Sequence, residues 1–435
     1  MNARIIKRLA LASALFAACG LAQAQDLLIR NATVHTSSAR GTLRNTDVLV
    51  KQGRIAAIGS GLVAGNAPVV DAQGQSLTPA LFGGITDIGV EEVSGESSTV
   101  DGTLALGANA ADMQVRPEFD VTLAYNPDSV LVPVARVEGI GWTMLSAGTR
   151  PGGSFIGGQG GAVRLDGSLD AVGPHALFVT LGSDAAGLSG HSRAAQWMLL
   201  DQLIDEARGR IPADSKFALL TPAGRATLAN YLGDGTAVKP LVVVRIQRAA
   251  DIVRLLRWAK RRGVNIALLG AAEGWKVAPQ IAAAKVPVFV DALADLPADF
   301  DSLGATLENA ARLHAAGVKV SFSQFGDASH NARKIRQLAG NAVANGLPWE
   351  AALAGLTATP AAAFGLGGEL GATIAVGQRA DLVLWSGDPL DVANVARQVW
   401  LDGRAIPMRS RQTELRDRYL HPDNGLPRTY PDGAR

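Results

Sequence analysis

The stretch LTPALFGGITDIGVEEVSGE, residues 77–96, decides the fold of this chain. Its first half is a continuous apolar run, as expected for a strand that is buried on both faces of a sheet. Its second half is a glycine-rich, acidic loop that contains Asp87. Because α/β barrels keep their chemistry just beyond the carboxyl ends of their strands, we expect this loop to belong to a functional site.

The long middle of the chain, residues 79–370, alternates apolar strands with helical segments. Further strands are expected at residues 141–147, 239–247, 265–270, 286–290 and 318–323. One clear helix is expected at residues 249–263, where apolar residues recur on one face and Gly263 ends the run. This alternation predicts an α/β fold, a (β/α)8 TIM-type barrel with room for irregularity near its second and third units.

The two ends of the chain carry short strands instead. In residues 25–78 the dipeptide Gln52-Gly53 lies between two alternating apolar runs, which predicts a hairpin. Similar short strands return in residues 371–407. We therefore expect one small β-sandwich built from both ends of the chain. Residues 408–435 predict a polar surface tail with a short helix near residues 413–419.

The first 24 residues have the pattern of a signal peptide. Three basic residues precede an apolar run over residues 9–21, and Ala22-Gln23-Ala24 is a cleavage site of the A-x-A type. The apolar run is shorter than the ~20 residues that a membrane span needs. We expect cleavage after Ala24 and a periplasmic or secreted protein. A lipoprotein anchored through Cys19 is the less favoured alternative, because Phe16 stands where leucine is usual.

Cysteine content and charge exclude several other classes of protein. Cys19 is the only cysteine, so the mature chain has no thiol for catalysis or for metal binding. Removal of the leader leaves 38 basic and 39 acidic residues, and no polybasic run stands out. We expect no nucleic-acid partner and no membrane span.

Residues 148–167, GTRPGGSFIGGQGGAVRLDG, are dense in glycine. A phosphate-binding loop of the GxxxxGK[ST] type would feed a helix and carry a lysine, and neither signal is present. Glycines also mark places where two backbones approach closely. We predict a loop here that either faces the substrate or packs against a neighbouring strand.

The stretch at residues 77–96 resembles the first barrel strand of the amidohydrolase superfamily, in which PGLIDAHxHLG supplies two metal-binding histidines. Pro79, Leu81 and Gly89 agree with that pattern, whereas the two histidine positions fall on Ile85 and Asp87. The phrases DVLVKQGRIAAIG and GQRADLVLWSGDPLD resemble the framework of the same family. The GGQG phrase resembles its periplasmic, imidazolonepropionase-like branch.

This resemblance implies hydrolysis of non-peptide or dipeptide-like amide C–N bonds with one or two divalent metals such as zinc. The remaining ligand positions, however, are substituted as well. Arg245 and Gln247 take the place of histidines on strand five, and Gly270 does so on strand six. On strand eight Phe325 stands at the aspartate position, unless a two-residue shift brings Asp327 there. We therefore expect no metal and no other cofactor.

Strand four of the family often provides a carboxylated lysine, and Lys216 and Lys239 are the nearest candidates in the sequence. The candidate catalytic residues that remain are Asp87, Asp327 and His330. The candidate substrate-binding residues are Arg245, Gln247 and Glu273. We expect His330 to orient the following helix more readily than to bind a metal. A nearby Arg245 would lower the pKa of Asp87 and weaken it as a base.

Three functions fit these observations. The chain is a catalytically impaired or non-catalytic subunit that binds small amide or peptide-like molecules, or it is an active amide hydrolase with a site rebuilt around Asp87, Asp327 and His330. The third is a purely structural exported protein. Family habit further implies a homo-oligomer or a complex with a homologous amidohydrolase.

Overall fold

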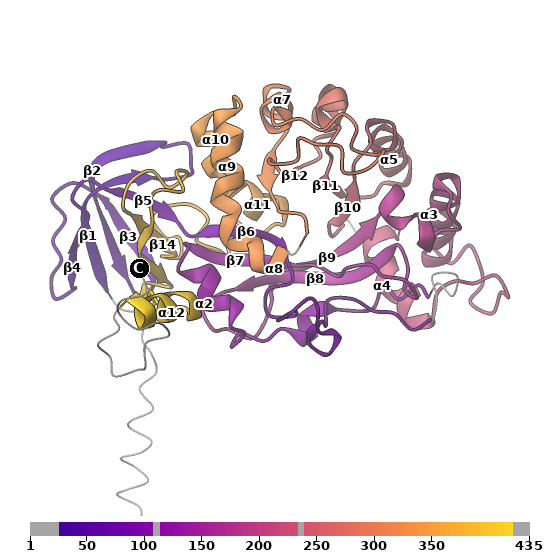
Figure 1. The fold of residues 1–435 in the computed structure, drawn as a ribbon, viewed down its shortest axis with the longest axis horizontal. Helices are drawn as coiled ribbons and strands as arrows, with labels where there is room; N and C mark the ends of the chain where they lie inside the picture. The colour runs from indigo at the N-terminus through magenta and orange to yellow at the C-terminus, as the bar shows by residue number, and fades with distance from the viewer. Residues whose placement is uncertain (1–25, 108–113, 234–238, 327, 421–435) are drawn as a thin grey trace, which may run out of the picture.

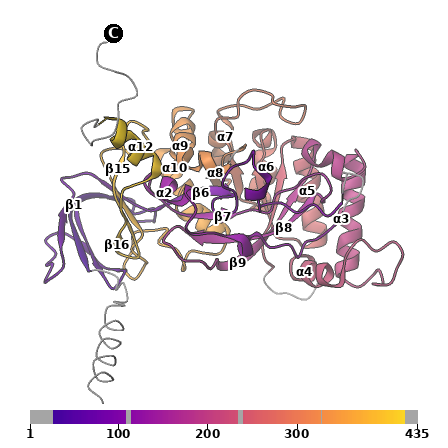
Figure 2. The same cartoon turned by 60° about the horizontal axis from the view of Figure 1, so that its bottom comes forward.

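The computed structural model describes residues 26–107, 114–233, 239–326 and 328–420, which form two eight-stranded sheets (Figure 1). Strands from both ends of the chain lie together at one side of the molecule, and the barrel occupies the other side (Figures 1 and 2). The predicted leader, with its cleavage site and Cys19, lies outside the described residues. No helix in the described ranges has the length and apolar character needed to cross a bilayer.

The barrel sheet keeps its strands in chain order from β6 to β13. These strands are β6 (Leu81–Thr86), β7 (Ile140–Leu145), β8 (Ile156–Arg164), β9 (Val172–Thr180), β10 (Val242–Ile246), β11 (Ile266–Gly270), β12 (Val288–Val290) and β13 (Val320–Phe322). The first and last strands approach each other, because the Ile85 backbone N–H donates to Ser323 Oγ at 3.1 Å. The predicted barrel is confirmed, and it is nearly closed.

The third strand runs against its neighbours. β8 pairs antiparallel with both β7 and β9, whereas β9 to β13 are parallel to one another. The prediction of a loop over residues 148–167 was wrong where β8 passes through it. Its glycines do mark close approaches: a Cβ added at Gly160 would lie 2.0 Å from the Leu145 carbonyl oxygen, and one at Gly157 would lie 2.3 Å from that of Ala147.

Helices connect most of the other strands. The helices are α2 (Leu131–Arg136), α3 (Arg193–Ala207), α4 (Pro222–Leu232), α5 (Ala249–Arg262), α6 (Ala278–Ala284), α7 (Asn309–Ala315), α8 (Ala328–Asn331), α9 (Ile335–Ala344), α10 (Trp349–Gly355), α11 (Ala358–Ala363) and α12 (Arg411–Leu420). The 3-10 helices are η1 (Ser97–Thr99), η3 (Val121–Ala124), η4 (Ser183–Leu188), η5 (Gly274–Val277) and η6 (Ala332–Lys334). Helix α5 confirms the prediction, since it buries Ile252 and Leu255 and ends at a left-handed Gly263.

The terminal sheet has the order β16-β15-β14-β5-β1-β2-β3, with β4 paired to β1. Its strands are β1 (Leu27–His35), β2 (Thr42–Lys51), β3 (Arg54–Gly59), β4 (Val69–Asp71), β5 (Ser76–Pro79), β14 (Leu382–Trp385), β15 (Ala396–Leu401) and β16 (Arg404–Ala405). The predicted hairpin is confirmed, because Gln52 and Gly53 both have positive φ between β2 and β3. The strands form one hydrogen-bonded sheet around their own apolar core.

Aromatic rings fill the interior of the barrel. The Phe82 ring lies 4.4 Å from that of Trp142, and the Phe289 ring lies 5.1 Å from that of Phe364, between ring centroids. Ile85 belongs to the same apolar cluster. This packing fills the interior of the barrel with apolar side chains.

The terminal sheet is joined to the barrel by Arg379. Its guanidinium lies 2.8 Å from an Asp166 carboxylate oxygen beyond β8 and 3.0 Å from one of Asp381 just before β14. These two carboxyl groups are largely buried. Loss of the cation would leave the Asp381 carboxylate without an ion-pair partner in the described part of the chain, which is costly in a poorly solvated place, whereas Asp166 would keep Arg164 at 3.1 Å.

We predict that Arg379→Met lowers the free energy of unfolding by about 3 kcal/mol, the usual cost of breaking a buried ion pair. Thermal unfolding followed by circular dichroism measures it. The control is Arg409→Met, which removes a pair with Glu414 that is exposed on both sides. That change should cost less than about 1 kcal/mol. Equal effects of the two variants would contradict the assigned role of Arg379.

Candidate functional site

Two cavities open at the carboxyl ends of the barrel strands. The larger has a volume of about 370 Å³ and is lined by Ser146, Thr149 and Thr180 among others. The smaller has a volume of about 180 Å³ and is lined by Gln247 and Phe325 among others. Because these residues follow different strands, the barrel itself brings them together.

Arg245 and Asp184 line both cavities. Arg245 is the fourth residue of β10, and its neighbour two positions earlier, Val243, belongs to the apolar interior. The side chain of Arg245 therefore also points inward, since alternate residues of a strand share a face. Its guanidinium carbon lies 4.9 Å from the centre of the Phe325 ring. The strand-five and strand-eight positions thus form a cation–π pair.

The strand-one positions differ from each other in environment. Ile85 is 4% exposed within the apolar interior. Asp87 follows β6 and accepts a hydrogen bond from Ser146 Oγ at 3.3 Å. Burial raises the pKa of the Asp87 carboxyl to about 7, and the charge of Glu91 adds to this, while Ser146 and Arg245 act in the opposite direction. The expectation of a lowered pKa was wrong, because desolvation outweighs the attraction of Arg245.

Gln247, which follows strand five, lies against Gly270 at the end of strand six. A Cβ added at Gly270 would lie 2.6 Å from the side-chain amide atoms of Gln247, and Gly270 has a φ of +96°. Gln247 is held in place because its Oε1 accepts from the Ala272 backbone N–H at 3.1 Å. The side chain of Gln247 therefore covers the site at which a strand-six ligand would begin.

These side chains do not suit a divalent metal. A guanidinium carries a permanent charge and offers no lone pair, so Arg245 would repel a cation. Ile85, Gly270 and Phe325 provide no donor atom at all. Within the described ranges, no three His, Cys, Asp or Glu side chains lie close enough together to hold a metal ion.

The other predicted residues lie in several places. Asp327 is outside the described residues, and His330 lies on the short helix α8. Glu273 is buried and accepts hydrogen bonds from Lys276 Nζ at 2.6 Å and from the Ala249 backbone N–H at 3.1 Å. These contacts fix the loop after β11, and Glu273 lines neither cavity in the part of the chain described.

Neither suggested lysine lies on the fourth barrel strand. Lys216 precedes α4 and Lys239 precedes β10, whereas β9 ends at Thr180. Thr180 also pairs with Arg245 in the sheet and lines the larger cavity. A neutral hydroxyl therefore stands at the end of this strand.

Asp184 is a site residue that the sequence reasoning missed. It lies in η4, directly after β9, and partial desolvation raises the pKa of its carboxyl group, with Asp299 and Asp301 adding to the effect and Arg245 opposing it. The signal was present in the phrase LFVTLGSD, where an apolar run ends in small and polar residues. It was overlooked because the strand order around β8 was not resolved from the sequence.

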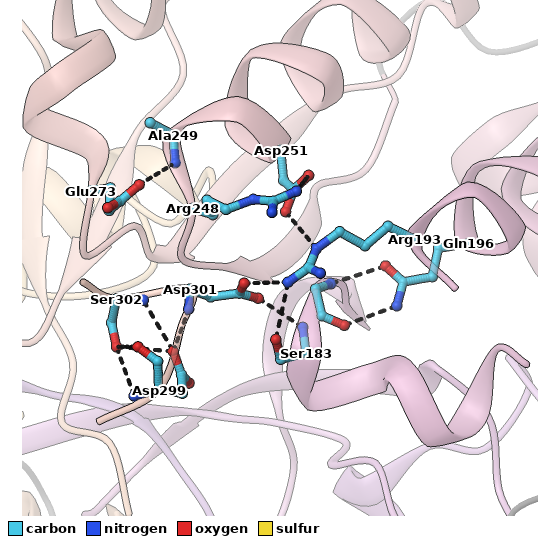
Figure 3. A network of polar contacts seen from close by, with 11 residues as sticks. Ser183, Arg193, Gln196, Arg248, Ala249, Asp251, Glu273, Asp299, Asp301 and Ser302 are labelled. Atoms are coloured by element: carbon cyan, nitrogen blue, oxygen red, sulfur yellow. Dashed lines mark hydrogen bonds and ion pairs between the residues drawn. The ribbon is translucent and has the colours of Figure 1, made fainter. Parts of the chain in front are cut away.

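An ion-pair network fixes the loops around Asp184. Figure 3 shows Arg193 between Asp251 and Asp301, with the first pair at 3.0 Å. The other Asp301 oxygen accepts from the Ser183 backbone N–H at 2.8 Å. Because Ser183 begins η4, the network sets the position of its neighbour Asp184. Segments after β9, β10 and β12 are held together in this way.

Comparisons with known proteins give a consistent result. Residues 248–406 match the model of the amidohydrolase family. The amidohydrolase tasK of Hapsidospora irregularis is 50% identical over 60 residues, which are 14% of this chain and 6% of that protein. The chain thus spans only a small part of the length of this relative.

Solved structures resemble the chain over most of its length. An amidohydrolase from Thermotoga maritima MSB8 has a TM-score of 0.76 and 24% identity, covering 88% of this chain and 100% of that one. Molinate hydrolase has a TM-score of 0.52 and 14% identity, covering 95% and 99%. At these identities the likeness shows the fold, which agrees with the barrel and terminal sheet described above.

We predict that Gly270→Ala destabilises the protein by about 1–3 kcal/mol, because an alanine at this φ is strained and its Cβ meets Gln247. The double variant with Gln247→Ala should lose less than the sum of the two single changes, by about 1 kcal/mol. Chemical denaturation of the four proteins measures this coupling. Strict additivity would show that Gln247 does not fill the space over Gly270.

A second prediction concerns pH. A carboxyl whose pKa is raised on folding is ionised in the unfolded chain at a lower pH than in the folded one, so stability falls as pH rises from about 4 to about 7. Asp87→Asn has no ionisable carboxyl at this position and should therefore not lose stability in this pH range for this reason. Its thermal midpoint relative to the wild type should therefore rise between pH 5 and pH 8, by a few degrees. A difference that is constant with pH would contradict the raised pKa.

Proposed function

We propose that the chain belongs to the amidohydrolase superfamily, and that it is a non-catalytic or catalytically impaired subunit that binds small amide or peptide-like molecules. Within the family we place it in the imidazolonepropionase-like branch, whose relatives hydrolyse amide C–N bonds. The observation that carries the proposal is the cation of Arg245 near the carboxyl end of β10, where it lines both cavities and contacts the Phe325 ring. This is the region in which the family implies a divalent metal.

The other positions at which the family has metal ligands are also unsuited to a metal. Metal-dependent hydrolysis needs a cation that lowers the pKa of water and polarises the carbonyl oxygen. Here Ile85 is packed in the apolar interior, and Gln247 covers Gly270. Restoring one ligand would therefore not rebuild the site, because several other ligand positions would still lack a donor atom.

A second candidate is an active amide hydrolase with its site rebuilt around Asp87, Asp327 and His330. One observation favours it: a carboxyl group with a pKa of about 7 suits a general base at neutral pH. Asp327 lies outside the described residues, and the candidate therefore rests on Asp87. Bound metal or turnover of simple amides would distinguish this candidate from the binding subunit.

We also propose that the protein is exported to the periplasm or secreted after cleavage behind Ala24, and that lipidation at Cys19 is the less favoured alternative. A homo-oligomer, or a complex with a homologous amidohydrolase, fits a subunit that does not catalyse by itself. These proposals rest on the leader pattern and on the habit of the family. We propose no nucleic-acid partner, because the charge is balanced.

We predict that the mature protein retains less than about 0.1 metal ion per chain after incubation with zinc or manganese and desalting, since the side chains at four of the ligand positions, Ile85, Arg245, Gly270 and Phe325, offer no lone pair. Elemental analysis measures it. Intact mass of the same sample, recovered from a periplasmic fraction, should correspond to a chain that begins at Gln25. No hydrolysis of N-acyl or dipeptide-like amides is expected.

Two variants make the metal result interpretable. Asp87→Ala removes the one strand-one side chain that could bind a metal, and Asp101→Ala removes an exposed carboxylate nearby in the sequence. Near-stoichiometric metal that disappears only in Asp87→Ala would refute the non-catalytic assignment and support the rebuilt hydrolase. Metal lost equally in both variants would indicate surface binding.

A further inference from the structure

Arg245 differs from the other buried or half-buried arginines with which it can be compared, Arg336 and Arg379. Arg336 and Arg379 each have carboxylate partners, at 3.4 Å from Glu138 and at 2.8 Å from Asp166. By contrast, no hydrogen bond or ion pair joins the Arg245 guanidinium to any other of the described residues. Its contact is the ring of Phe325, whose centre lies 4.9 Å from the guanidinium carbon.

The free N–H groups of Arg245 face open space. The side chain lines both cavities, so the guanidinium lies between volumes of about 370 and 180 Å³. The charge is also poorly solvated, because desolvation lowers the pKa of Arg245 while Asp184 and Asp87 raise it. A recessed cation without hydrogen-bond acceptors is costly unless an anion completes it.

The surroundings of Arg245 limit the charge of such an anion. Asp184 lines the same two cavities, and the charge of Asp87 acts on the same guanidinium. Two carboxyl groups near one cation would repel a dianion such as phosphate. A carboxylate carries a single charge, and its two oxygens match the planar fork of a guanidinium.

Neutral polar groups stand around the same space. Ser146, Thr149 and Thr180 line the larger cavity, and Gln247 lines the smaller one. Hydroxyl and amide side chains can both donate and accept, so they suit the N–H and C=O of an amide. The apolar side chains of Phe178 and Leu269 complete the wall of the larger cavity.

We propose that Arg245 anchors the carboxylate of a small monoanionic ligand that also carries an amide group, with the rest of the ligand in the larger cavity. This assignment deepens the proposed function and rests on it, because the carboxylate takes the region that a metal would occupy in the family. Arg245 is the specificity-determining residue of the site, and Asp184 excludes ligands with a second negative charge.

The test uses isothermal titration calorimetry on the full mature protein. The probes are N-acetylglycine and N-acetyl-L-leucine, the corresponding neutral amides, and inorganic phosphate. At least one acid should bind at least tenfold more tightly than its amide, because only the acid can form charge-assisted hydrogen bonds with the recessed arginine. Phosphate should bind more weakly than that acid.

Arg245→Gln should reduce the affinity for the acid at least tenfold and leave the affinity for the amide unchanged, and Arg245→Lys should recover part of the loss. The matched control is Arg312→Gln. Arg312 also stacks on an aromatic ring, that of Trp275 at 4.4 Å, but it is exposed and pairs with Glu308 outside the two cavities. This control should bind the acid like the wild type.

Several outcomes would overturn the inference. These are equal binding of acid and amide, an unchanged affinity in Arg245→Gln, tighter binding of phosphate, or no binding of either acid up to 10 mM, roughly the weak limit of specific recognition. Thermal unfolding shows whether Arg245→Gln is folded. A metal-free protein that binds neither acid refutes this inference alone, whereas stoichiometric metal refutes the proposed function.

Discussion

The stacking of the Arg245 guanidinium on the Phe325 ring determines what the mouth of this barrel can hold. It joins the end of strand five to the loop after strand eight and fixes one positive charge at the place where the strands converge. The other features follow from that charge. Neighbouring carboxyl groups are tolerated, cations are disfavoured, and the polar walls of the two cavities face a donor to which no described residue offers a hydrogen-bond acceptor.

Much of the architecture could be predicted because it depends on local patterns. The hairpin at Gln52-Gly53 and helix α5 with its terminal Gly263 follow from short-range signals, and the structure confirms both. The reversed strand β8 could not be predicted in this way. Its glycines are typical of a loop, and only the closeness of neighbouring carbonyl groups, such as that of Leu145 beneath Gly160, explains why a strand needs them.

The sequence indicated which residues lie at the ends of the barrel strands, but it did not indicate how burial changes their pKa values. The resemblance of two segments to family motifs singled out Asp87, Arg245 and Gln247, and the structure places all three at or just beyond the carboxyl ends of barrel strands. The pKa of Asp87 was misjudged, since a sequence shows that an arginine is near but not how much water has been removed. Asp184 was missed for a related reason, as its place depends on loops that a network around Arg193 and Asp301 holds in position.

The pairing of β5 with β14 gives the chain a fixed order of assembly. Leu77 pairs with Leu384, so one edge of β5 has no partner until almost the whole polypeptide has been made. An unpaired edge invites association with other strands, which is a hazard during synthesis. The barrel strands, by contrast, pair mainly with their neighbours in sequence. Strand β14 can therefore complete the terminal sheet only after nearly the whole chain has been made. A molecule truncated before residue 382 would keep an unpaired edge on β5, which could associate with other strands.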